Sequence, residues 1–305
     1  MSATFFAGDL FVLIARLIAD GSDLETRLDA AADAFAVEGM PLASAAMLDF
    51  CGDVLQLSFA EADPAMVLAG IDRFFAPADV LVAEREIVIP RLFVSDMDST
   101  MIRQECIDEL ADYAGIKDRI AAITERAMRG ELDFGSALRE RVGLLEGLDE
   151  SAIEHCLEDR IVPTDGARTL VQTLNAKGAR CVLVTGGFHH FADRVADDLG
   201  FERVVGNRLE VVDGKLTGQL DGPISDASTK KATLIHELDE LGAEAVSMAA
   251  GDGANDIPMI ERADYGFAYR AKPKARDAAN GRIDRGDLTA ILSLLGIAKD
   301  EWVER

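Results

Sequence analysis

Cysteine is scarce in this chain and is not arranged for cross-linking. Four cysteines occur among 305 residues, at positions 51, 106, 156 and 181. None belongs to a C-x-x-C pair, and no cluster of histidines accompanies them. The pattern excludes a disulfide framework and a zinc site of the finger type, so we expect reduced, mostly buried thiols.

Positive charge is also in short supply. The chain has 31 Lys and Arg against 55 Asp and Glu, which gives a formal net charge of −24 at pH 7. A field of this sign repels polyanions and anionic membranes, so nucleic acid is not an expected partner. A small anionic molecule can still bind where Lys and Arg gather in a pocket.

Long apolar runs are missing as well. The most apolar N-terminal stretch, "LFVLIARLIAD", is interrupted by Arg16 and lacks the basic leader and cleavage site of a signal peptide. No run approaches the ~18 apolar residues of a membrane-spanning helix. We therefore expect a cytoplasmic protein with no membrane partner.

Apolar residues are nevertheless abundant, at 49%, and 305 residues suffice for one large or two modest domains. Residues 1–88 mix helical patterns with short apolar runs, which predicts a small N-terminal α+β module. In residues 89–305, amphipathic helices separate strand-like runs without strict period-two alternation, which predicts a parallel sheet covered on both faces. The runs are 92–95, 180–187, 245–253 and 265–269.

Two segments interrupt this alternation. Residues from about 104 to 163 are helical in pattern throughout, which predicts a helical cap inserted between the first two strands of the core. In "NRLEVVDGKLTGQL", Asp213-Gly214 stands between two alternating runs and predicts a hairpin turn.

Polar residues follow three of the predicted strands. They are "DMD" at 96–98, "TGG" at 185–187 and "GDGAND" at 251–256. Ligands of an open α/β sheet bind outside the carboxyl ends of the strands, so these segments are expected to meet in one crevice.

The acids in these segments favour an oxygen-bound metal ion. An EF-hand loop starting at Asp96 would need Gly and Glu where the chain has Met101 and Ile107, so that alternative is excluded. A D-x-D pair alone also occurs in metal-dependent sugar transferases. Asp252 and Asp256, at another strand end, shift the balance toward a Mg²⁺ site built from carboxylates.

The other polar residues suit phosphoryl transfer. Lys230 or Lys231 can supply a cation, and Thr185, Gly186 and Gly187 lead into a helix whose free N–H groups can bind phosphate. A carboxylate beside a metal can act as the nucleophile, and a second acid two residues later can protonate the leaving oxygen.

The segments "DMDST", "VTGGF", "K-x-x-L" and "GDGANDIPMI", in this order and with a helical insert after the first, resemble the four motifs of the haloacid-dehalogenase (HAD) superfamily of phosphatases. Longer stretches, including "SDMDSTMIRQECIDELADYAG", resemble the phosphoserine phosphatases, which complete serine biosynthesis. The resemblance covers residues from about 90 to 295. It implies an α/β, HAD-like Rossmannoid core with a parallel sheet and a small helical cap, beside the N-terminal α+β module.

The resemblance also implies catalytic and metal-binding roles. Asp96 would be the nucleophile that becomes an aspartyl phosphate, and Asp98 the general acid and then the base. Mg²⁺ would be held by Asp96, by Asp252 and by the main-chain carbonyl of Asp98, with Asp256 in support.

Phosphate contacts follow from the same resemblance. Thr185, with Gly186 and Gly187, and one lysine would bind the phosphoryl oxygens, and Asn255 would orient the site. We prefer Lys231 over Lys230 because its spacing to Leu234 and Leu238 suits the family helix. Many members have Ser at the position of Thr185, so an extra methyl group must be accommodated.

The cap is expected to recognise the substrate. The resemblance sets Glu105 against the ammonium and Arg141 against the carboxylate of O-phospho-L-serine, with Met128 and Phe134 as apolar walls. Each has a plainer structural interpretation: Glu105 as a helix-terminus acid, Arg141 on a solvated helix face and Phe134 as core.

The sequence thus predicts Mg²⁺-dependent hydrolysis of O-phospho-L-serine through an aspartyl phosphate. The alternative is a phosphatase or phosphotransferase for another small phosphorylated amino acid, such as phosphothreonine or phosphohomoserine. A more distant alternative is an amino-acid-binding regulatory protein with residues 1–88 as an ACT-like sensor. The module could equally be a dimerising appendage, which leaves a homodimer open.

Overall fold

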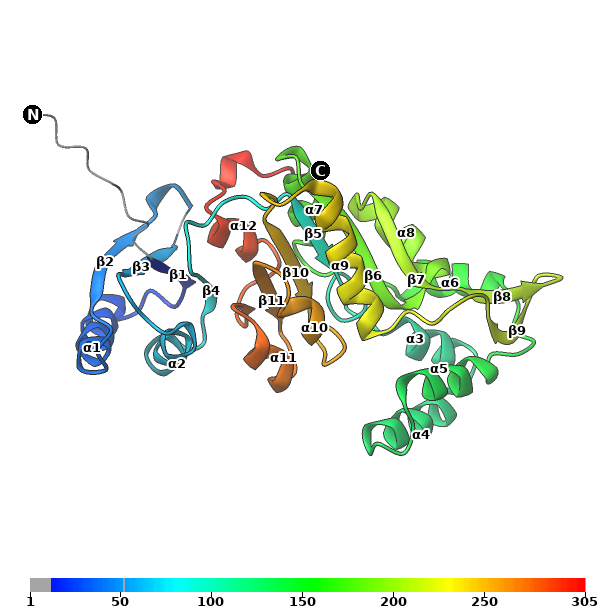
Figure 1. The fold of residues 1–305 in the computed structure, drawn as a ribbon. Helices are drawn as coiled ribbons and strands as arrows, with labels where there is room; N and C mark the ends of the chain where they lie inside the picture. Colours follow the sequence, from blue (N-terminus) through cyan, green and yellow to red (C-terminus); the bar gives the residue numbers. More distant parts are fainter. Residues whose placement is uncertain (1–11, 52, 305) are drawn as a thin grey trace, which may run out of the picture. The chain divides into compact units, whose positions relative to one another are not determined.

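The computed structural model describes residues 12–51 and 53–304. They form two compact units, drawn in Figure 1: one comprises the described residues up to Ile89 together with Asn280–Trp302, and the other Pro90–Ala279 with Val303 and Glu304. The sequence predicted a division between residues 88 and 89 and assigned residues 280–302 to the core. In the structure, residues 280–302 add a strand and a helix to the N-terminal unit.

The N-terminal unit contains an antiparallel sheet in the order β2-β3-β1-β4-β12. Its first part runs β-α-β-β-α-β along the chain, as an α+β module should. The elements are β1 (Leu13–Ile18), α1 (Leu24–Val37), β2 (Leu42–Met47), the 3₁₀ helix η1 (Asp49–Cys51), β3 (Leu55–Phe59), α2 (Pro64–Phe75), β4 (Asp79–Ala83), β12 (Gly281–Ile283), α12 (Ala290–Leu295) and the 3₁₀ helix η2 (Lys299–Glu301).

Strand β1 accounts for the interrupted apolar stretch at the N-terminus. Its residues alternate between buried and half-buried, as a strand with one face on the core requires. Arg16 lies on the other face, where its guanidinium donates to Gln56 and to the carbonyl of Leu294.

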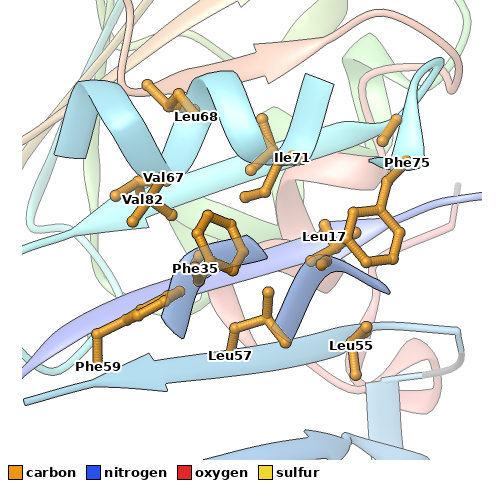
Figure 2. Close-up of a cluster of buried hydrophobic side chains, with 14 of the residues drawn as sticks. Leu17, Phe35, Leu55, Leu57, Phe59, Val67, Leu68, Ile71, Phe75 and Val82 are labelled. Carbon is orange, nitrogen blue, oxygen red and sulfur yellow. The ribbon is translucent and has the colours of Figure 1, made fainter. Parts of the chain in front are cut away.

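The core of this unit is apolar. Figure 2 shows side chains from the two helices, including Phe35, Val67 and Ile71, meeting those of the strands, including Leu57 and Phe59. The rings of Phe35 and Phe59 meet edge to face with centroids 5.2 Å apart. Burial of these apolar groups stabilises the unit.

The second unit contains the predicted parallel sheet, in the order β11-β10-β5-β6-β7. Its elements are β5 (Leu92–Ser95), α3 (Cys106–Tyr113), α4 (Lys117–Met128), α5 (Phe134–Gly143), α6 (Ser151–Arg160), α7 (Ala167–Ala176), β6 (Arg180–Phe188), α8 (His189–Leu199), β7 (Arg203–Asn207), β8 (Leu209–Val212), β9 (Lys215–Leu220), α9 (Ala227–Leu241), β10 (Ser247–Gly251), α10 (Ile257–Ile260), β11 (Tyr265–Tyr269) and α11 (Pro273–Ala278).

Both faces of this sheet are covered, which explains why its strands lack alternation. On one face, Leu92 and Val94 of β5 pack with Leu234 of α9 and Met259 of α10. On the other face, Phe93 contacts Phe201, which follows α8, with ring centroids 6.1 Å apart. Every position of β5 is therefore buried, as in a parallel α/β sheet.

The two predicted interruptions are also confirmed. Helices α3–α6 form the insert between β5 and α7 (Figure 1). Strands β8 and β9 form the hairpin, and its two turn residues, Asp213 and Gly214, have φ values of 53° and 73°. Two positive φ angles characterise a type I′ turn, which Asp-Gly favours.

The helices bear on the predicted absence of a membrane segment. Within residues 12–51 and 53–304, none combines the length and the apolar character needed to cross a bilayer.

Candidate active site

Asp96 follows β5 at the carboxyl end of the sheet. Its Oδ1 accepts a hydrogen bond from the N–H of Met97 at 2.8 Å and lies 2.6 Å from Nζ of Lys230. Burial raises the pKa of Asp96 well above its usual range, and the charge of Asp256 raises it further, whereas Lys230 lowers it. The site therefore depends on positive charge to keep this carboxylate ionised.

Lys230, and not Lys231, is the lysine of the site. Lys230 is buried in the first turn of α9 and Lys231 is exposed, which contradicts the preference for Lys231. Lys230 belongs to the buried stripe of α9 that continues through Thr233, Leu234 and Glu237, the i, i+3, i+4, i+7 spacing of one helix face. The buried residue one heptad after the lysine is Glu237 and not Leu238, so the lysine on this face is Lys230.

Asp256 anchors the loop that follows β10. Its Oδ1 is 2.7 Å from Nζ of Lys230, and its Oδ2 accepts hydrogen bonds from the N–H groups of Asp252 and Gly253 at 3.2 and 3.0 Å. Gly251 permits this approach, because a Cβ there would lie 2.4 Å from Cγ of Asp256. Both oxygens of Asp256 are thus engaged within the protein.

The acids are arranged as a donor set for a hard cation. Asp96, Asp252 and Asp256 each offer a carboxylate oxygen, and these atoms lie within 4.8 Å of one another. Oδ1 of Asp98, which lies in the same loop as Asp96, is buried with no hydrogen-bond partner among the described residues. An all-oxygen donor set with excess negative charge fits an ion such as Mg²⁺.

Thr185 lies inside β6, toward its carboxyl end, and is fixed from several sides. Its Oγ1 accepts from the N–H of Gly187 at 2.8 Å, and its carbonyl accepts from Oγ of Ser225 at 2.9 Å. Nδ2 of Asn207 donates to the carbonyl of Gly186 at 2.7 Å.

Two glycines leave space for the side chains of Thr185 and Asp98. A Cβ at Gly206 would lie 3.1 Å from the methyl group of Thr185, so the missing side chain accommodates the methyl that Thr carries and Ser does not. A Cβ at Gly187 would lie 3.1 Å from Oδ2 of Asp98. These contacts set the Thr185 loop directly against the Asp98 carboxyl.

A cavity of about 240 Å³ joins the predicted residues of core and cap. From the core, its walls include Asp96, Asp98, Thr185, Gly186, Gly187, Asp252 and Asn255. From the insert they include Glu105, Phe134 and Arg141. The side chain of Met128 lies outside the described part of the structure.

Asp98 has an environment suited to proton transfer. Burial raises its pKa to about 7, and the negative charge of Glu105 adds to the rise, whereas hydrogen bonds from Cys106 lower it. A carboxyl with a pKa near neutrality can donate and later accept a proton under physiological conditions.

Glu105 is oriented by a residue to which the sequence gave no role. Ser99 adopts a left-handed backbone conformation with φ of 56°, and its Oγ donates to Oε1 of Glu105 at 2.8 Å. Ser225 and Asn207, which hold the Thr185 loop, were also missed. Short polar residues outside the motifs carry no sequence signal of such contacts.

Comparisons with known proteins agree with this geometry. The sequence profile of the haloacid dehalogenase-like hydrolases matches residues 93–261. A phosphoserine phosphatase of Archaeoglobus fulgidus is 46% identical over 208 residues, which cover 67% of this chain but 60% of that protein. One of Polaromonas sp. is 42% identical over 211 residues, 67% of this chain and 89% of that protein.

A solved structure supports the same relationship. An analogue of the phospho-aspartyl intermediate of a phosphoserine phosphatase superposes with a TM-score of 0.61 at 37% identity, covering 67% of this chain and 97% of that one. The chain therefore belongs to the haloacid dehalogenase-like hydrolases, within the phosphoserine phosphatase family.

Proposed function

We propose that this chain hydrolyses O-phospho-L-serine to L-serine and phosphate through an aspartyl phosphate on Asp96. The carrying observation is that one cavity combines Asp96 and Asp98 with an acid and a base from the cap, Glu105 and Arg141. An amino-acid phosphate has a phosphate, an ammonium and a carboxylate, and this cavity provides a counterpart for each.

In the first step, an oxygen of Asp96 attacks phosphorus, and the bond from phosphorus to the serine oxygen breaks. Met97 and Lys230 both contact Oδ1, which leaves Oδ2 as the attacking atom. The carboxyl of Asp98 gives its proton to the departing serine oxygen, which leaves as a hydroxyl.

In the second step, water attacks the phosphorus of the aspartyl phosphate. Asp98, now a carboxylate, accepts a proton from this water, and the bond from phosphorus to Asp96 breaks. Inorganic phosphate leaves, and both carboxyl groups return to their starting states.

The chain's own groups hold the phosphoryl oxygens in both steps. Lys230 and the hydroxyl and loop N–H groups at Thr185 would bind them, and Asn255 would orient the site. The Asp96 and Asp252 carboxylates and the Asp98 carbonyl would hold the metal, with Asp256 bracing the loop, and we propose Mg²⁺. When bound, it would neutralise charge on the phosphate and the nucleophile.

A substrate panel tests this function. With Mg²⁺, the wild-type chain should release phosphate from phosphoserine faster than from phosphothreonine, phosphoethanolamine or glucose 6-phosphate. Arg141→Lys should raise KM for phosphoserine about 10²-fold and leave phosphoethanolamine, which lacks the carboxylate, little affected.

Arg139→Lys is the matched control, because Arg139 is exposed on the same helix and is not part of the cavity wall. It should behave as wild type. Equal rates on glucose 6-phosphate and phosphoserine would contradict the proposal.

We further propose that the N-terminal unit is an ACT-like module that senses serine. Its β-α-β-β-α-β order with an antiparallel sheet supports a small ligand-binding or dimerising module. Calorimetry with L-serine and a catalytically inactive chain tests binding, and sedimentation tests the expected homodimer. A cytoplasmic location is proposed from the sequence alone.

A further inference from the structure

Lys272 contacts the active site but has no role in the reaction described above. It stands between β11 and α11, and its backbone N–H donates to the carbonyl of Asp252 at 2.9 Å. Its Nζ lies 3.4 Å from Oδ2 of Asp252, and the side chain is 70% exposed. It lines the same cavity as Glu105 and Arg141.

The charges of the cavity explain why a solvent-exposed cation matters there. Four acids line the wall, Asp96, Asp98, Glu105 and Asp252, and the buried ammonium of Lys230 is already shared between Asp96 and Asp256. A phosphomonoester brings about two further negative charges to a chain whose net charge is −24. A cation that is accessible from solvent therefore favours the approach of the phosphate.

The present neighbours of Lys272 are the groups that other cations neutralise when the site is loaded. Asp252 belongs to the proposed metal-binding set, and Glu105 faces the substrate ammonium. Desolvation raises the pKa of Glu105, the Ser99 hydrogen bond lowers it, the charge of Asp252 raises it and the charge of Lys272 lowers it. This lysine therefore acts on both acids. Once both acids have other partners, the ammonium of Lys272 is left for the phosphate.

We propose that Lys272 is a substrate-binding residue that captures the phosphate at the cavity mouth, exchanging Asp252 for a phosphate oxygen. The flexible four-carbon stem of lysine and its compact charge suit such an exchange. The inference rests on the proposed function, because it requires a phosphomonoester substrate.

The test compares Lys272→Met with Lys274→Met in the full chain with Mg²⁺. Lys274 is an exposed lysine of α11 that does not line the cavity, so it matches the change in charge without touching the site. At low ionic strength, K272M should lower kcat/KM for phosphoserine about tenfold, mainly through KM, and weaken the dependence of kcat/KM on salt. K274M should match wild type, and K272R should recover most of the loss.

Direct binding gives a second measurement that does not depend on turnover. Calorimetry with inorganic phosphate and Mg²⁺ should show about tenfold weaker binding to K272M than to K274M. Equal phosphate affinity in the two variants would overturn the inference, as would tighter Mg²⁺ binding by K272M with unchanged phosphate binding, which would make Lys272 a competitor of the metal. Wild-type activity on phosphoserine tests the proposed function separately.

Discussion

The two units bury different kinds of groups. The N-terminal unit is built around an apolar cluster, and its buried charges are individually satisfied: Asp79 accepts from the N–H groups of Arg285 and Gly286, and Arg282 pairs with Asp72. The second unit brings Asp96, Asp252 and Asp256 together, with buried Lys230 against Asp96 and Asp256 and exposed Lys272 against Asp252. Buried charges cost stability unless they are paired, so an excess of acids at one point marks a site retained for a ligand.

The largest effect should come from the proposed nucleophile. Asp96→Asn removes the carboxylate proposed to attack phosphorus and should lower kcat by ~10³-fold or more. Thermal unfolding should change little, because asparagine can still accept the Met97 hydrogen bond and Lys230 keeps its ion pair with Asp256. Phosphate release and a melting curve measure both, and near-normal turnover would end the proposed mechanism.

A core substitution in the N-terminal unit should lower stability and leave activity unchanged. Phe35→Ala removes a fully buried ring and should lower the free energy of unfolding by about 3–5 kcal/mol. The reaction rate per folded molecule should stay unchanged, since no reacting group lies in that cluster. Denaturant titration, followed by a probe of the N-terminal unit, measures the loss of stability. A matching loss of kcat per folded molecule would contradict the expectation.

The two adjacent lysines of α9 allow the effect of removing a buried charge to be compared with that of removing an exposed one. Lys230→Met leaves Asp96 and Asp256 without their shared cation and should cost about 3 kcal/mol or more of stability, together with activity. Lys231→Met is the control and should change stability by less than about 0.5 kcal/mol. Equal effects in urea denaturation would contradict the burial described for Lys230.

The smallest effect concerns pH. Burial raises the pKa of Asp79, although hydrogen bonds from the backbone oppose the rise. The folded state therefore binds a proton more readily than the unfolded state, and this carboxyl adds stability as pH falls through its raised pKa toward 3.8. As the pH is lowered from 7 to 4, the free energy of unfolding of the wild type should rise relative to that of Asp79→Asn. A difference that stays flat, or that reverses, would contradict the shift.

Much of the site could be predicted because its chemistry lies at strand ends. Asp96, Thr185 and Asp252 each follow an apolar run, and parallel topology brings such ends together. The choice between Lys230 and Lys231 failed because the side chains of adjacent helix residues point about 100° apart. Taking Leu238 as part of the buried face therefore selected the wrong lysine.

Other features depend on contacts between distant parts of the sequence. Strand β12 has three residues, too few for a pattern, and is defined by pairing with β4 about two hundred positions earlier. The hydrogen bond from Ser99 to Glu105 accompanies a positive φ angle at Ser99, which the presence of a serine does not signal in the sequence.

The hairpin has a consequence for substrate exchange. Besides its covalent ends, the helical insert is joined to β9, where the N–H of Gly147 donates to the carbonyl of Leu216 at 2.8 Å and Asp149 bridges to Lys215. A cap held at three places cannot swing about a single hinge without breaking these bonds. If these bonds persist, any opening of the helical insert must carry β8 and β9 along, so the hairpin limits how far the insert can move away from the core.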